Sequence, residues 1–321
     1  MAKILVFVEH HEGEAAKGSL GVLGKAASLG EGIAAAVVGK GARGVAEGLG
    51  AHGASNVHAA EDPALDSPLP QPRVDVLAKL VADEGYDTVL FAASVLSADV
   101  AAGLASRLEA GLNWDLVDLE KRDGTLVGRR PALGDSVIVD VGWKTEPRLA
   151  LFRSGAFEPA AGNGGSAEVA DVPVELEDFS GATQMLEQAH EESTGPSIED
   201  ADVIVAGGRG LGEPDKFALL EELAKALGGA VAATRAVVDA GWYPYATQVG
   251  QTGKSVSPKL YLACGISGAI QHKVGMQSSG TIVAINKDAN APIFEYADLA
   301  VVGDLHEIVP KLTELLRARK G

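Results

Sequence analysis

The chain has 321 residues, 46% of them hydrophobic and 5% aromatic, so it is long enough for two domains with separate cores. Its 27 basic and 44 acidic residues give a formal net charge of −17, which argues against nucleic acid or an anionic membrane as the main partner. The single cysteine, Cys264, excludes an internal disulfide, and no run of residues is apolar enough for a membrane helix. We therefore expect a soluble, cytoplasmic protein.

The N-terminal part alternates short apolar runs with segments whose apolar residues recur at helical spacing. Strands are expected over residues 3–9, 33–38, 56–59 and 88–92. Helices are expected over residues 42–49, 73–84 and 98–109, and in a segment that starts near Leu20 and ends at Gly30. This alternation of strand and helix predicts a parallel sheet with helices on both faces.

The pattern changes after Gly111. Four short runs of strand type follow without helices between them, at residues 114–119, 125–128, 136–141 and 148–152. They predict an antiparallel extension on the first sheet. Residues 154–171 carry little apolar bulk and are expected to be irregular. Residues 187–202 are polar and acidic and contain a Gly-Pro pair, so we place a domain boundary between residues 190 and 191.

The alternation begins again in residues 191–321. Strands are expected over residues 202–206, 230–233, 260–264, 281–285 and 299–302. One helix is expected to start at Pro214, and a closing helix over 304–317 is expected to be capped by Asp304 and kinked by, or to start at, Pro310. The fold class is therefore α/β with two doubly wound domains, 1–190 and 191–321, and a ligand is expected at the carboxyl ends of the strands.

Two nucleotide-binding motifs nearly match and are rejected. The GGRGLGEP segment at residues 207–214 lies between an expected strand and an expected helix, but Glu213 stands where a dinucleotide fingerprint needs its third glycine. The GKS at residues 253–255 resembles the end of a phosphate-binding loop. Gln248 stands at that motif's first glycine, however, and Pro258 would block the helix that must follow.

Residues 241–288 alternate glycine-rich polar loops with short apolar runs. Glycine leaves no side chain in the way, so backbone N–H groups in such loops can approach a phosphate or a flat heterocycle. Arg209 stands between glycines just after an expected strand, where its guanidinium could hold a pyrophosphate through two hydrogen bonds. There are three alternatives: Arg209 is an exposed turn arginine, the loop at residues 248–252 is only solvated, and His272 is an ordinary histidine. We interpret the region as a nucleotide or cofactor site.

Five motifs in this region carry a resemblance to a known family. They are GGRG at 207–210, TRAVVDAG at 234–241, VGQTGK at 249–254, GISGAIQH at 265–272 and TIVAINKD at 281–288. Their order and spacing are similar to the FAD-binding domain of the alpha subunit of electron transfer flavoprotein. The N-terminal part resembles that family in layout more than in motif. The resemblance implies a DHS-like, Rossmann-type FAD-binding domain in residues 191–321.

The resemblance also implies roles for individual residues. It places Arg209 near the diphosphate of FAD, and Arg235 against the reactive edge of the flavin ring, where a positive charge raises the reduction potential. Thr234 stands where many family members carry serine and keeps a hydroxyl for a phosphate. Thr252 is implied to lie near the ring nitrogen N5, and His272 near the carbonyl O2, where a proton donor stabilises charge on the reduced ring.

Further residues are expected to bind FAD, some from their position and the others because the resemblance implies it. Ser267, Gly268 and Ala269 are expected to open a short helix, with their N–H groups toward an anion. Asn286 and Asp304 end or follow strands at the same edge, and the family uses such residues for the ribityl or adenosine part. The expected set also contains Gln248, Val249, Gly250, Gln251, Gly265 and Gln271. No catalytic or metal-binding constellation is expected.

The resemblance implies an electron carrier, not an enzyme: the FAD-holding alpha subunit of a heterodimeric electron transfer flavoprotein. The carrier would take electrons from flavin dehydrogenases, such as the acyl-CoA dehydrogenases of fatty-acid β-oxidation, and deliver them to a quinone oxidoreductase. A beta subunit that binds AMP would complete it, and the N-terminal domain would be a scaffold and docking surface. The alternatives are a related flavoprotein for nitrogen fixation, carnitine metabolism or bifurcation, and a nucleotide-binding module that moves no electrons.

Overall fold

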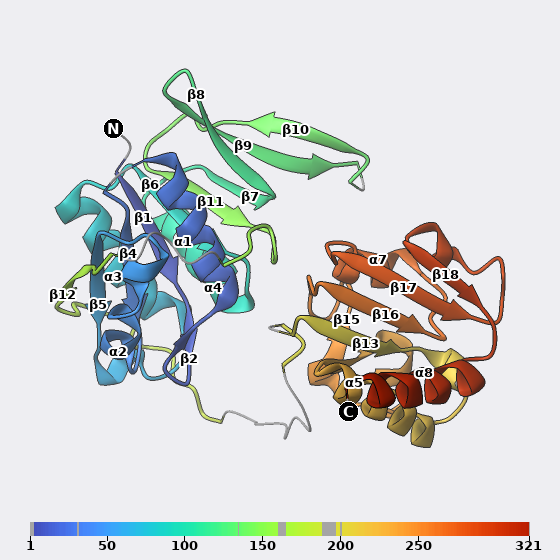
Figure 1. Cartoon of the computed structure of the whole chain (residues 1–321). Coiled ribbons are helices and arrows are strands. Elements are labelled where there is room, and N and C mark those ends of the chain that lie inside the picture. Colours follow the sequence, from blue (N-terminus) through green and yellow to red (C-terminus); the bar gives the residue numbers. More distant parts are fainter. Residues whose placement is uncertain are drawn as a thin grey trace. The chain divides into compact units, whose positions relative to one another are not determined.

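The computed structural model describes residues 3–30, 32–133, 135–159, 165–187, 197–199 and 201–320. The chain divides into two compact units, residues 1–188 and 189–321, and each has its own parallel sheet (Figure 1). The domain boundary expected at residues 190 and 191 lies outside the described residues. In the described part of the chain, no helix combines the length and the apolar character needed to cross a membrane.

The first unit is built on a parallel sheet of seven strands in the order β12-β5-β4-β1-β6-β11-β7. These strands are β1 (Ile4–Val8), β4 (Ala34–Val38), β5 (Asn56–Ala60), β6 (Thr88–Ala92), β7 (Leu112–Leu116), β11 (Arg148–Phe152) and β12 (Glu168–Asp171). A short hairpin of β2 (His10–His11) and β3 (Glu14–Ala15) follows β1. The strands β1, β4 and β6 are buried along their whole length, because helices cover both faces of the sheet.

Two hydrophobic cores lie on the two faces of this sheet. Helices α1 (Lys17–Leu29) and α2 (Ala42–Ala46) pack on one face through residues such as Leu23 and Val45. Helices α3 (Pro70–Glu84) and α4 (Val95–Arg107) pack on the other face through residues such as Leu77 and Leu104. The expected α/β layering with helices on both faces is confirmed.

The expected antiparallel extension is only partly correct. β8 (Asp118–Arg122), β9 (Thr125–Ala132) and β10 (Val137–Val141) do form a separate antiparallel sheet in the order β10-β9-β8. β11 and β7, however, pair in parallel inside the main sheet, so the antiparallel expectation is wrong for them. Parallel neighbours need a long crossover, and here the antiparallel sheet serves as that crossover in place of a helix.

Residues 154–171 are also only partly as expected. The expectation of an irregular segment is wrong for residues 168–171, which form the edge strand β12 parallel to β5. β12 is short and largely exposed, with Glu168 and Asp171 at its ends. Short, charged edge strands limit pairing with other chains. Because such a strand is charged and exposed, it lacks the apolar pattern by which a strand is predicted from sequence.

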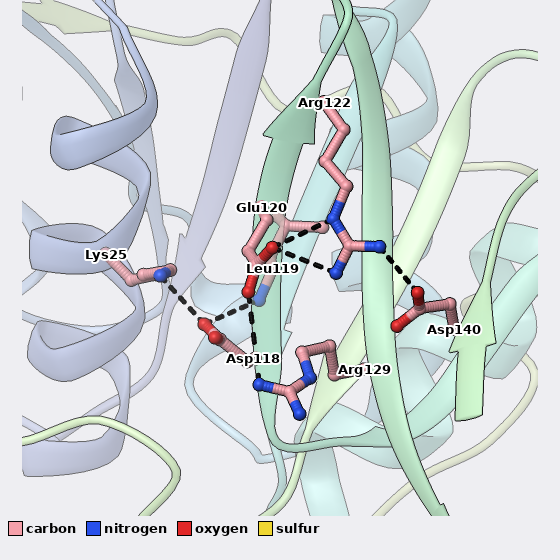
Figure 2. A network of polar contacts seen from close by, with 7 residues as sticks. All are labelled: Lys25, Asp118, Leu119, Glu120, Arg122, Arg129 and Asp140. Carbon is pink, nitrogen blue, oxygen red and sulfur yellow. Dashed lines mark hydrogen bonds and ion pairs between the residues drawn. The ribbon is translucent and has the colours of Figure 1, made fainter. Parts of the chain in front are cut away.

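A network of charged side chains connects the antiparallel sheet to the rest of the first unit (Figure 2). Lys25 of α1 reaches Asp118 at the start of β8, with 2.7 Å between the ammonium nitrogen and the carboxylate oxygen. Arg122 bridges Glu120 on its own strand and Asp140 on β10. The pairs on β8 and β10 are partly exposed, so they fix orientation more than they add stability.

The second unit contains a parallel sheet of six strands in the order β15-β14-β13-β16-β17-β18 (Figure 1). The strands are β13 (Val203–Gly207), β14 (Ala230–Thr234), β15 (Gln248–Val249), β16 (Leu260–Cys264), β17 (Thr281–Asn286) and β18 (Leu299–Val302). Helices α5 (Phe217–Leu227), α6 (Arg235–Val238) and α8 (Leu305–Lys320) adjoin one core, and α7 (Ile270–Met276) adjoins the other. This is the doubly wound layout expected for the C-terminal domain.

Pro310 was expected to kink the closing helix or to mark its start, and the second of these expectations is wrong. The helix α8 begins at Leu305, so Pro310 lies inside it and does not mark its start. The expected cap is present, because the Asp304 side chain accepts a hydrogen bond of 2.8 Å from the backbone N–H of His306. The helix therefore starts at the residue that the sequence indicated.

Candidate functional site

The carboxyl edge of the second sheet has one point where the strand order reverses. The chain runs from β13 outward to β14 and β15, and then returns to place β16 on the other side of β13. Sheets of this type bind ligands at such a switch point, in the crevice outside the carboxyl ends of the strands. Here the loops that follow β13 and β16 flank the reversal.

These two loops touch each other through their backbones. The N–H of Gly208 donates to the carbonyl of Cys264 over 3.1 Å, and the N–H of Gly210 donates to the carbonyl of Gly265 over 2.9 Å. A Cβ on Gly210 would lie 2.6 Å from the Cα of Gly265, so no larger residue fits without moving backbone. The glycines on both sides of Arg209 are therefore required by close packing, and they bring Arg209 to the switch point.

Residues 248–254 form a compact loop at the end of β15. The N–H of Lys254 donates to the carbonyl of Gln248 over 2.7 Å, and the N–H of Gly250 donates to the carbonyl of Lys254 over 3.1 Å. Inside the loop, the side-chain amide of Gln248 donates to the hydroxyl oxygen of Thr252 over 3.1 Å. Gln248 is only 2% exposed, whereas Gln251 and Thr252 are exposed. The side chains of Gln251 and Thr252 are therefore exposed, and the buried side chain of Gln248 supports the loop from below.

The 248–254 loop is attached to α7 by two hydrogen bonds. The N–H of Gln251 donates to the carbonyl of Gln271 over 2.7 Å. The Nδ1 of His272 lies 3.0 Å from the carbonyl of Val249, and the Nε2 of His272 lies 2.9 Å from the hydroxyl of Tyr261. A carbonyl only accepts, so Nδ1 carries the proton and Nε2 accepts from Tyr261. His272 is thus a neutral link between the sheet and the loop.

Burial explains the protonation state of His272. The side chain is 6% exposed, and loss of solvation lowers its pKa to about 4, although the bond to the Val249 carbonyl acts in the opposite direction. Burial likewise raises the pKa of the Tyr261 hydroxyl. In this arrangement both ring nitrogens have partners inside the unit. The implied position of His272 beside a flavin carbonyl remains a prediction.

The loop between β16 and α7 offers a row of backbone donors. In the described part of the chain, the N–H groups of residues 267–271 donate to no protein acceptor. Gly268 has a φ of +90°, and a Cβ there would lie 2.2 Å from the backbone nitrogen of Ile293. The side-chain amide of Asn286 donates to the carbonyl of Ile266 over 2.9 Å and fixes the loop from the end of β17. Successive free N–H groups of this kind bind anions.

The expected helix start differs slightly from the observed one. Ser267, Gly268 and Ala269 were expected to open the helix, but α7 begins at Ile270 and Ala269 is its capping residue. The three residues therefore belong to the loop that precedes the helix. Their N–H groups remain available to a ligand because none of them is used in an intrahelical bond.

Two arginines supply positive charge at the same edge. Arg209 is exposed, and among the described residues its guanidinium has no ion-pair or hydrogen-bond partner. Arg235, the first residue of α6, pairs with Asp239 one turn later, with 3.1 Å between Nε and the carboxylate oxygen. A cation without a protein partner at a switch point is suited to an anionic ligand, whereas the charge of Arg235 is partly balanced by Asp239.

The expected site residues come from the carboxyl ends of the parallel strands and from the segments that follow them. The N-terminal cap of α6 is Thr234, the last residue of β14, and Asp304 follows β18 as the cap of α8. The side chains of Gln248, Val249 and His272 are buried, so they support the loops from inside. A direct contact of any of these residues with a cofactor remains a prediction.

Two tyrosines that no sequence pattern indicated position this region. Tyr261 is fully buried in β16, and Tyr245 donates from its hydroxyl to the carbonyl of Thr252 over 3.0 Å. Tyr261 stands in an apolar run and reads as core, and Tyr245 stands in a polar loop. No local pattern reveals hydrogen bonds between residues that far apart in the chain.

The fold and the free donors at this edge define an α/β protein with a candidate site for an anionic ligand. Family models agree: "Electron transfer flavoprotein domain" matches residues 4–177, and "Electron transfer flavoprotein FAD-binding domain" matches residues 197–277. The chain is 44% identical to an electron transfer flavoprotein subunit alpha of Mycobacterium leprae and 45% identical to one of Mycobacterium tuberculosis, each over 100% of both chains. It is 39% identical to Protein FixB of Clostridium saccharobutylicum, over 96% of this chain and 94% of that protein.

The chain therefore belongs to the family of electron transfer flavoprotein alpha subunits, and its C-terminal unit is an FAD-binding domain. The residues present fit this cofactor. The free N–H groups of residues 267–271 and the unpaired guanidinium of Arg209 suit a diphosphate. The side-chain oxygen Oε1 of Gln248 is buried without a partner among the described residues, as expected of an acceptor beside a ligand site.

Proposed function

We propose that this chain is the FAD-holding alpha subunit of a heterodimeric electron transfer flavoprotein. In this proposal it is a cytoplasmic electron carrier, not an enzyme, that accepts electrons from flavin dehydrogenases such as the acyl-CoA dehydrogenases of fatty-acid β-oxidation. It passes them to a quinone oxidoreductase. The observation that carries the proposal is that free backbone donors, Arg209 and the 248–254 loop lie at one edge of the sheet. The chain is also similar over its full length to an alpha subunit.

The proposal assigns the parts of FAD to the parts of this edge. The diphosphate is held by Arg209 and by the N–H groups of Ser267, Gly268 and Ala269. Thr234 adds a hydroxyl from the end of β14, the strand that pairs with β13. The flavin ring lies against Gln251 and Thr252, with Arg235 supplying positive charge. The ribityl and adenosine parts take Asn286 and Asp304 as partners at the ends of β17 and β18. These assignments are supported by residue type and by position at the edge.

FAD, when bound, supplies the electron-transfer chemistry, and the protein supplies binding and orientation. The Thr252 hydroxyl is oriented so that it can donate a hydrogen bond to a ligand. Its oxygen accepts from the Gln248 amide over 3.1 Å, so its own proton is available to a ligand at the exposed side of the loop. Arg235 adds a positive charge, which favours the reduced, more negative forms of a flavin.

The N-terminal unit is proposed as a scaffold and docking surface. Its sheet also has a switch point, between β1 and β6, where a nucleotide could bind. Glu9, which follows β1, places its carboxylate there and accepts hydrogen bonds from the hydroxyls of Ser94 and Ser97 at the start of α4. The protein's own carboxylate therefore fills the position at which this type of sheet binds an anion.

The proposal includes a beta subunit as the partner of this chain. The curated relatives are named as alpha subunits, which supports a partner of a different sequence. In the proposed heterodimer the beta subunit binds AMP and is recognised by the dehydrogenases. The exclusion of a nucleotide from the N-terminal switch point by Glu9 is in keeping with a nucleotide carried by the partner.

The test begins with the absorbance spectrum of this chain purified with the product of its neighbouring gene. Flavin bands and stepwise reduction by dithionite are expected, followed by reduction when an acyl-CoA dehydrogenase and its substrate are added. A yellow protein that no flavin dehydrogenase reduces would contradict the dehydrogenase assignment. A colourless protein that fails to take up FAD would contradict electron carriage and leave a nucleotide-binding module. The related flavoproteins of nitrogen fixation, carnitine metabolism or bifurcation would be reduced by other donors.

A further inference from the structure

Thr252 is held by side chains at two of its polar groups, the hydroxyl and the carbonyl. Its hydroxyl oxygen accepts from the amide of Gln248 over 3.1 Å, and its carbonyl oxygen accepts from the hydroxyl of Tyr245 over 3.0 Å. Gln248 is buried at the base of the 248–254 loop, while Tyr245 approaches from the segment that follows α6. Two anchors of different origin therefore fix both the direction of the hydroxyl and the plane of the next peptide.

We propose that Tyr245 is a positioning residue for the flavin site, acting through the carbonyl of Thr252. The inference rests on the proposed function, because Thr252 is the residue proposed to face the flavin ring. The backbone bonds of the loop involve Gln248, Gly250 and Lys254, and its bonds to α7 involve Gln251 and Val249. The N–H of Gly253, which shares a peptide plane with the Thr252 carbonyl, donates to the carbonyl of Gly250 over 2.9 Å. The loop therefore holds this peptide at its N–H, and Tyr245 holds it at its carbonyl.

The exposure of Tyr245 shows that its role is not core packing. The side chain is 61% exposed, and it belongs to neither hydrophobic core of the second unit. A large aromatic side chain on the surface stabilises a fold little, so the hydroxyl bond to Thr252 is its identifiable structural contribution. Removal of that hydroxyl should therefore disturb the loop and leave the rest of the unit intact.

Tyr243 provides a matched control two residues earlier. Its ring stacks on Phe217 with 4.4 Å between ring centroids, and its hydroxyl donates to the carboxylate of Glu221 on α5 over 3.1 Å. These contacts lie on α5, which contributes none of the proposed site residues. Tyr243→Phe and Tyr245→Phe thus delete the same atom two residues apart, and the second deletion removes the bond to Thr252.

The experiment compares wild type, Tyr245→Phe and Tyr243→Phe, each purified with the partner subunit. Tyr245→Phe should raise the dissociation constant for FAD by about three- to tenfold, the loss typical of one hydrogen bond. It should also lower the flavin reduction potential, because a less ordered Thr252 hydroxyl donates more weakly to the reduced ring. Tyr243→Phe should match wild type in both measurements. Equal values for all three proteins would overturn the inference.

A double-mutant comparison tests whether Tyr245 acts through Thr252. In the Thr252→Val background there is no hydroxyl to orient, so Tyr245→Phe should no longer change the reduction potential. A potential shift of the same size in both backgrounds would show that Tyr245 acts on the flavin directly, and it would overturn the positioning role. Failure of the wild type to bind FAD would instead contradict the proposed function, so the two failures are distinguishable.

Discussion

Gly210 donates its backbone N–H to the carbonyl of Gly265 over 2.9 Å, across the point where the strand order of the second sheet reverses. The two loops pack so closely that a Cβ on Gly210 would lie 2.6 Å from the Cα of Gly265. The neighbouring atoms are backbone, which cannot move aside as a flexible side chain can. The switch point is therefore set by glycines, and the rest of the site is placed relative to it.

Gly210→Ala should accordingly destabilise the protein and weaken FAD binding together. Overpacking against backbone costs about 1–3 kcal/mol, which urea unfolding can measure. Gly44→Ala is the control, because a Cβ at Gly44 in α2 meets no atom within 4 Å. Alanine favours a helix over glycine by up to about 1 kcal/mol, so this variant should be neutral or slightly more stable. Equal stability of the two variants would argue against the close packing.

Arg209→Ala should weaken FAD binding while leaving the fold intact. The guanidinium has no protein partner among the described residues, so its removal breaks no internal bond. Loss of a charge-assisted hydrogen bond costs about 1.5–3 kcal/mol, equivalent to about a ten- to hundredfold higher dissociation constant. Fluorescence titration of the FAD-free protein measures the change. Arg317→Ala on α8, which removes the pair with Glu222, is the control and should bind FAD normally.

Arg235→Ala should lower the flavin reduction potential. A unit charge near the ring, partly screened, is worth on the order of 1 kcal/mol, equivalent to tens of millivolts. Asp239 offers a test of opposite sign, because its carboxylate pairs with Arg235. Asp239→Asn should raise the potential by leaving the positive charge less balanced. A redox titration that gives unchanged potentials for both variants would remove Arg235 from the flavin environment.

Gln248→Met should separate the support of the loop from the stability of the fold. The substitution removes the bond to Thr252, and it also removes the buried Oε1 that has no partner. These two effects oppose each other, so the free energy of unfolding should change by less than about 1 kcal/mol. The FAD dissociation constant should still rise several-fold, because Thr252 loses its orienting donor. A loss of several kcal/mol of stability would identify Gln248 as purely structural.

His272 should make stability depend on pH. Burial lowers its pKa from 6.5 in the unfolded chain to about 4 in the folded protein, so the unfolded state binds more protons between these values. The stability is fully present above about pH 6.5 and is lost as pH falls toward about 4, by at most about 3 kcal/mol. Urea unfolding of FAD-free protein at pH 7.5 and pH 5 measures the loss, which His272→Asn should reduce. His306→Asn is the control for the substitution itself, because the side chain of His306 is exposed.

The sequence alone determined most of the layered fold and indicated where the candidate site lies. Continuous apolar runs such as Ile4–Val8 and Leu260–Cys264 indicate strands covered on both faces, because only such strands are apolar at every position. The glycines and polar residues that follow these runs marked the carboxyl edge. Their similarity to a known family gave the cofactor. These are local properties, so a single sequence records them.

Tertiary structure alone decided which segments pair and which side chains meet. β11 was expected in an antiparallel sheet and lies between two parallel strands, because strand direction depends on the path of the 31 residues between β7 and β11. The bonds from Tyr261 to His272 and from Tyr245 to Thr252 each join two different segments of the chain, so no periodicity within one helix or strand pairs these residues. The local pattern of apolar residues indicates which residues are buried. Which strands pair and which side chains bond to each other depends on the folded chain.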